Sequence, residues 1–243
     1  MSRRSIGIFT AATAGMACAA LIGGPAFADT ATPTPTPTAS HAPKTLAQLQ
    51  AAGAKATSDR ETKLTAAITK VNADTSLTSS DKSTILATLN TDLAGMKSSA
   101  SAIAADTTTT QAAADLKKVF TSYRVDAVAL PQARLASDAD RLTGTTLPKL
   151  TKEQSTLATL LSGKDKAKST SALQSDLSDM SAQLSTASHD ASGVAAAALA
   201  VTPTSYDANH SALSSAKSSL ASARAAVKKA QADAKAVREA VKK

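Results

Sequence analysis

Few side chains in this sequence are placed to do chemistry. His41, His189 and His210 are the three histidines, and no H-x-x-x-H pair places two of them on one helix face, as a helical zinc site requires. No serine lies in a G-x-S-x-G turn, and no Gly-rich loop precedes a helix as a phosphate cradle would. Asp138 and Asp140 are two residues apart, so a helix turns them to different faces. We therefore expect no enzyme, no metal site and no cofactor.

One segment concentrates large side chains and is the candidate for a small ligand pocket. Residues 120–131 include Phe120, Tyr123 and, at the end, Pro131. In a pocket, Tyr123 and Arg124 would supply the polar contacts to a ligand. The other interpretation is that the segment forms the thickest part of a helical core, with Pro131 kinking the helix or starting a new one.

Positive charge is concentrated near the end of the chain. The sequence has 27 Lys and Arg against 19 Asp and Glu, and residues 211–243 hold eight of the basic residues and two of the acidic ones. If Leu213 and Leu220 occupy heptad position a, three cations fall at position e and three at position b, which are neighbours around a helix. We call this candidate polyanion-binding set the basic ribbon: Lys217, Arg224, Lys228, Lys235, Arg238 and Lys242.

The basic ribbon allows two interpretations. Either another helix pairs with it, or it faces solvent and an acidic partner. In an antiparallel pair e positions face e positions, so Asp176 and Asp190, at position g of the preceding helix, would not neutralise it. The polyanion that we expect is teichoic acid or another acidic wall polymer, and extracellular nucleic acid is the alternative.

Helices must position these residues. The chain has 9 Gly, 8 Pro, no Trp and 2% aromatic residues, and its apolar residues, mostly Ala, recur at spacings of three and four. This pattern excludes an aromatic-rich core and a β-sandwich. It predicts an all-α fold over residues 45–243: an elongated antiparallel helical bundle or coiled-coil hairpin of about five to six helices.

The C-terminal part has the most regular heptad seams. The first seam consists of Leu173, Leu177, Met180, Leu184, Ala187, Ala191, Val194 and Ala198. The second consists of Leu213, Ala216, Leu220, Ala223, Val227, Ala230, Ala234, Val237 and Val241. Since 202–205 reads as the end of one helix and the cap of the next, these seams predict an antiparallel coiled-coil hairpin over 169–243.

The earlier helices are less regular. In the first, over 45–73, the apolar spacing slips near Arg60, as in a stutter. The second has a predicted seam of Leu86, Leu89, Leu93, Met96, Ala100 and Ile103. Residues 143–148 hold one Gly, three Thr and one Pro, so they either break or bend the helix around them.

The N-terminal region predicts export. Arg3 and Arg4 precede a short apolar run, and Ala26-Phe27-Ala28 forms an A-x-A cleavage site, which indicates a signal peptide over 1–28. Residues 29–44 alternate Thr and Pro and are predicted to be a disordered linker. We expect a secreted protein without a membrane span, either free or held non-covalently at the cell wall.

Two stretches resemble a family. The motifs are Tyr-Arg-Val followed by Leu-Pro-x-x-Arg-Leu, within 123–135, and Thr-Pro-x-x-Tyr-x-x-Asn over 202–209. They are similar to motifs in uncharacterised secreted, Ala-rich helical proteins of actinobacteria. The resemblance implies export and a helical fold but brings no activity. Asp126 stands where such relatives often have a second Tyr, which counts against an aromatic-pair pocket.

Together these features predict a secreted, non-enzymatic structural or interaction protein of the cell envelope. Its expected partner is an acidic wall polymer or another coiled-coil protein, and self-association is compatible with the weak Ala-rich seams. One alternative is an extracellular nucleic-acid-binding protein that uses the same ribbon. The other is a small-ligand or enzyme-regulating helical module centred on Tyr123 and Arg124.

Overall fold

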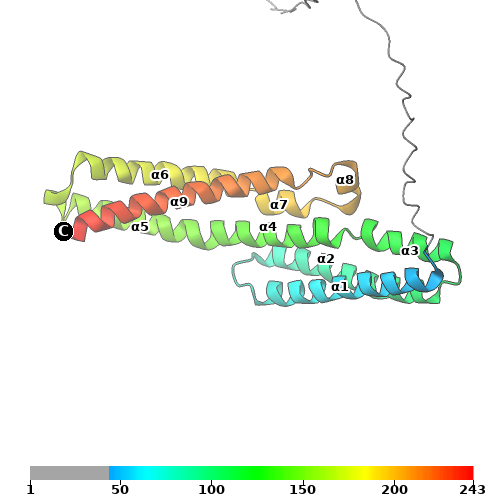
Figure 1. Cartoon of the computed structure of the whole chain (residues 1–243). Helices are drawn as coiled ribbons and strands as arrows, with labels where there is room; N and C mark the ends of the chain where they lie inside the picture. The colour runs from blue at the N-terminus through cyan, green and yellow to red at the C-terminus, as the bar shows by residue number, and fades with distance from the viewer. Residues whose placement is uncertain (1–43, 243) are drawn as a thin grey trace, which may run out of the picture. The chain divides into compact units, whose positions relative to one another are not determined.

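The computed structural model describes residues 44–242, which form helices joined by short connections, with no strand among them (Figure 1). The all-α antiparallel bundle that the sequence predicts is confirmed. The predicted signal peptide over 1–28 lies outside the described residues, and so does the predicted Thr-Pro linker apart from its last residue, Lys44.

Three helices open the fold: α1 (Leu46–Ala73), α2 (Ser79–Ala105) and α3 (Thr109–Thr121). A threonine precedes each helix, and its hydroxyl accepts a hydrogen bond from the backbone N–H three residues on; these are Thr45, Thr78 and Thr108. Caps of this kind satisfy N–H groups that have no partner inside the helix, and each stabilises a helix by about 1 kcal/mol.

The buried faces of α1 and α2 include residues that are not large and apolar. In α1 the small residues Gly53 and Thr57 are buried, and α1 stays unbroken through the slip near Arg60. In α2 the predicted seam residues Leu89, Met96 and Ile103 are buried. Ile85 and Asp92 are buried in place of their neighbours Leu86 and Leu93, which are half-buried, as is Ala100. Periodicity of large apolar residues cannot reveal a core position that is occupied by Gly, Thr or Asp.

Glycine explains the close approach of α1 and α2. A Cβ atom on Gly53 would lie 2.6 Å from Ile103 Cγ2 of α2, so a larger residue would collide there. A Cβ atom on Gly95 of α2 would overlap the Tyr123 ring, which packs directly on the α2 backbone. Both contacts depend on the missing side chain.

A long central helix follows and contains two π-helical turns. It consists of η1 (Val125–Ala129), α4 (Leu130–Arg141), η2 (Leu142–Thr146) and α5 (Leu147–Ser162). The N–H groups of Leu130 and Leu147 donate to carbonyl oxygens five residues back, and each of these leucines precedes a proline. A proline ring clashes with the carbonyl four residues before it, and the wider turn relieves that clash. Residues 143–148 therefore neither break nor end the helix.

The C-terminal part is built from η3 (Lys166–Lys168), α6 (Ser171–Ala191), α7 (Val194–Leu199), α8 (Pro203–Ala208) and α9 (Ser214–Lys242). The prediction of one unbroken helix through Ala198 is wrong, because Gly193 has a positive φ of 73° and separates α6 from α7. Thr202 caps α8, as predicted, but α9 begins only at Ser214. Every predicted seam residue in α6, α7 and α9 is buried except Val241, which is half-buried.

Two apolar cores share the central helix. The first joins α1, α2, α3 and η1 to the small residues Ala133 and Ala136 of α4. The second joins α5, α6, α7 and α9 to Leu135 and Ala139 on another side of α4. Helices α6 and α9 lie side by side and run in opposite directions, with α5 beside both (Figure 1).

Candidate functional site

The basic ribbon lies on α9, the longest helix of the C-terminal core. Its apolar seam faces α6, and all six ribbon residues are exposed. Helix α9 is rich in Ala, Lys and Arg, which are strong helix formers, and this composition accounts for its unbroken 29 residues. The predicted placement of all six cations on one helix is confirmed.

Two ribbon cations are paired with other helices. Arg224 Nη2 lies 2.6 Å from Asp138 Oδ2 of α4, and Arg238 Nη1 lies 3.0 Å from Glu153 Oε1 of α5. These two candidate polyanion-binding residues are therefore already paired with carboxylates inside the protein. Of the two interpretations, pairing with another helix holds for the arginines at heptad position e.

A π-turn brings both ion pairs into register. Arg224 and Arg238 are 14 residues apart, whereas Asp138 and Glu153 are 15 residues apart, with η2 between them. A π-turn adds one residue to an α-helix, so η2 accounts for the difference. Because α9 and the central helix run in the same direction in Figure 1, the two pairs fasten them together in parallel.

The other four ribbon residues are lysines, and all four are exposed on α9. We call Lys217, Lys228, Lys235 and Lys242 the outer lysines. Within residues 44–242, Lys235 has one distant partner, Glu239 at 3.7 Å, with both side chains mostly exposed, and the other three have no ion-pair partner. Exposed pairs of this kind contribute little. The outer lysines therefore present positive charge to solvent.

The acidic residues of α6 lie away from the ribbon. Asp176 and Asp179 approach Asp233 of α9. Burial raises the pKa of Asp233 above its ordinary value, and the charges of these two neighbouring carboxylates raise it further. Within the described part of the chain, neither Asp176 nor Asp190 forms an ion pair with a ribbon residue.

Tyr123 and Arg124 both contact other helices of the protein. Arg124 has a left-handed backbone with φ of 46°, between α3 and η1, and its Nε and Nη2 lie 2.7 and 2.6 Å from Asp207 Oδ1 of α8. Its guanidinium also lies 5.9 Å from the centre of the Tyr206 ring. Neither Tyr123 nor Arg124 lines the groove beside α1 and α4 or the groove beside α5 and α6. Tyr123 packs against Gly95 of α2 and Arg124 is paired with Asp207, so a ligand pocket centred on these residues stays a prediction.

The same contacts bring together the two motifs that resemble a family. Arg124 from the first motif holds Asp207 from the second, and Gln132 Nε2 donates to the Ala198 carbonyl, 2.7 Å away, just before the second motif begins. His210 stacks edge-on against Tyr206 with ring centroids 5.1 Å apart. These contacts fix the corner where α8 meets the central helix.

Within residues 44–242, no group of three His, Cys, Asp or Glu residues is arranged to hold a metal ion. The helices described for this chain include none with the length and apolar character needed to cross a bilayer. No family model, curated protein or solved structure matches the sequence or the fold.

Proposed function

We propose that this chain is a secreted, non-enzymatic protein of the cell envelope that binds an acidic wall polymer through the outer lysines of α9. The proposal is based on a difference between the arginines and the lysines of the basic ribbon. The arginines are held by Asp138 and Glu153, whereas Lys217, Lys228 and Lys242 are exposed and have no carboxylate partner within residues 44–242.

This division follows the chemistry of the two cations. Arginine forms directional hydrogen bonds with a carboxylate and suits a fixed contact between helices. Lysine carries a compact charge on a flexible chain and can follow the phosphates or carboxylates of a mobile polymer. Lys228, Lys235 and Lys242 recur at one heptad, so three cations are spread over about 21 Å along α9.

The absence of aromatic residues from α9 favours a polymer without bases. The sequence of Ser214–Lys242 contains no Phe, Tyr or Trp. Proteins that bind single-stranded nucleic acids usually stack bases on such side chains. The predicted signal peptide and the resemblance to secreted actinobacterial proteins support an extracellular partner.

The test is retention on isolated Gram-positive cell walls at low salt. A variant in which all four outer lysines are replaced by Gln removes four charges from α9 and should lose at least tenfold in bound fraction. High salt should release the wild type, because exposed charges are screened. The matched control replaces Lys97, Lys117, Lys149 and Lys152 by Gln, which removes the same charge from exposed positions on other helices. Equal retention of both variants would refute the proposal.

A second arm separates wall polymer from nucleic acid. Duplex DNA is titrated under the same salt conditions and compared with poly(glycerol phosphate), a wall-polymer mimic. We expect tighter binding to poly(glycerol phosphate). Tighter binding to DNA that also depends on the outer lysines would favour the nucleic-acid alternative.

A further inference from the structure

A groove of about 380 Å³ lies between the second half of α1 and α4. Its floor is apolar and is formed by Ala66, Ala67, Val71, Leu130 and Ala133. The lining residues of α1 span Lys63 to Asp74, or about 16 Å along the helix axis. The volume lies in the range of small-molecule sites, which are typically mostly apolar with a few polar groups.

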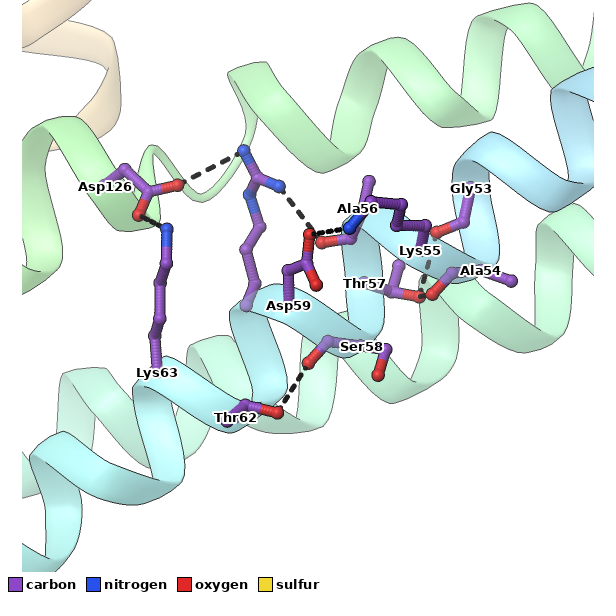
Figure 2. A network of polar contacts seen from close by, with 11 residues as sticks. Gly53, Ala54, Lys55, Ala56, Thr57, Ser58, Asp59, Thr62, Lys63 and Asp126 are labelled. Carbon is purple, nitrogen blue, oxygen red and sulfur yellow. Dashed lines mark hydrogen bonds and ion pairs between the residues drawn. The ribbon is translucent and has the colours of Figure 1, made fainter.

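Cations border this floor on both sides. Lys63 and Lys70 lie on α1 and Arg134 and Arg141 lie on α4, each pair one heptad apart. Lys63 Nζ is 2.6 Å from Asp126 Oδ1, and Figure 2 shows its side chain reaching from α1 to that carboxylate. Lys70 and Arg134 are exposed and have no ion-pair partner within residues 44–242.

The two acidic residues that line the groove already have partners. Asp138 Oδ2 holds Arg224 at 2.6 Å. Asp74 Oδ1 accepts hydrogen bonds from the Ser76 N–H and hydroxyl, at 2.8 and 2.6 Å, and its Oδ2 lies 3.6 Å from Arg141. The groove therefore combines uncompensated positive charge at its edges with an apolar floor.

From this combination we propose that the α1–α4 groove binds a single-chain amphiphilic anion. The linear apolar chain lies along the alanine floor, and the carboxylate or phosphate head group is held by Arg134 and Lys70. Apolar contact alone would not require the cations, and a free inorganic anion would leave the apolar floor exposed to water. The proposal concerns a different surface from the outer lysines and does not depend on the proposed function.

The test is isothermal titration calorimetry with dodecanoate and dodecyl phosphate below their critical micelle concentrations. We expect saturable binding of one molecule per chain. Inorganic phosphate, which has only the head group, and dodecyl maltoside, which has an uncharged head group, should each bind at least tenfold more weakly. A preference between the two amphiphiles would identify a carboxylate or a phosphate as the better head group.

Two variants locate the site. Lys70→Gln combined with Arg134→Gln should weaken binding of both amphiphiles about tenfold or more, while Lys97→Gln combined with Lys149→Gln should leave it unchanged. Ala66 is exposed at the groove, so Ala66→Phe should fill it without disturbing a core and should abolish binding. Circular dichroism checks that each variant stays helical. The proposal is overturned by no saturable binding of either amphiphile, equal binding of dodecyl maltoside, or unchanged binding by Ala66→Phe.

Discussion

Asp92 is a carboxylate at a core position of α2, where the flanking positions hold Leu89 and Met96. Asp92 is 8% exposed, and its Oδ2 atom has no hydrogen-bond partner within residues 44–242. Burial raises its pKa to about 6 from an ordinary value of 3.8. A residue of this kind lowers stability whenever it is charged.

The sign of this effect gives a pH-dependent prediction. Below about pH 3 Asp92 is protonated in both the folded and unfolded chains, and it carries no penalty. As pH rises to about 6 the unfolded chain loses its proton first, so the free energy of unfolding falls and stays lower above that pH. Asp92→Asn should therefore be more stable than wild type at pH 7 by about 2–3 kcal/mol, and the gain should vanish below about pH 3.

Urea unfolding of both proteins at several pH values measures this difference. Asp59→Asn is the control, because Asp59 is exposed and its hydrogen bond with Lys55 lowers its pKa. That variant should show no gain at pH 7. A gain for Asp92→Asn that is the same at pH 3 and pH 7 would show that charge burial is not the cause.

At the scale of elements, the central helix keeps two partners in register across η2. Its buried leucines include Leu142 and Leu147, five residues apart where a heptad seam allows three or four. The spacing of Asp138 and Glu153 shows the same extra residue against Arg224 and Arg238. One π-turn therefore aligns both the apolar contacts and the ion pairs of α5.

This geometry predicts that one deletion is tolerated and another is not. Deleting Gly144 together with Pro148→Ala removes both the extra residue and the ring that requires a wider turn, so the downstream faces keep their orientation. Deleting Gln154 instead rotates Leu157 and Leu161 by about 100° away from the core. The first variant should melt within a few degrees of wild type, and the second should melt about 10 °C lower or more.

Thermal unfolding followed by circular dichroism compares the two deletions. Both remove one residue from the same continuous helix, so each serves as the control for the other. Equal losses in melting temperature would mean that η2 does not absorb an extra residue.

The sequence predicted the packed helix faces where apolar residues repeat regularly. It did not predict features that depend on backbone conformation. The α6 and α9 seams were predictable because Leu, Met, Val and Ala recur without interruption. The break at Gly193 was not, since Ala191 and Val194 keep heptad spacing across it. The partners of Arg224 and Arg238 were also hidden, because Asp138 and Glu153 lie about 85 residues earlier and their alignment depends on η2. Arg124 was noticed for its chemistry, but its contact with Asp207 joins segments 83 residues apart.

At the scale of the described molecule, α4 connects the two cores and the two surfaces proposed to bind anions. Asp138 lies in the α1–α4 groove and also holds Arg224 of α9. The ribbon therefore divides into arginines that fasten α9 to the central helix and lysines that face outward. We propose that the lysines are therefore the residues that bind the wall polymer.

The salt dependence of binding to poly(glycerol phosphate) tests this most directly. For each protein, the logarithm of the binding constant is measured against the logarithm of salt concentration, and its slope reports the number of charge contacts with the polymer. We predict a steep negative slope for the wild type and a slope shallower by about two to four for the variant lacking the outer lysines. The control variant lacking Lys97, Lys117, Lys149 and Lys152 should keep the wild-type slope. Identical slopes for all three proteins would contradict the assignment of polymer binding to α9.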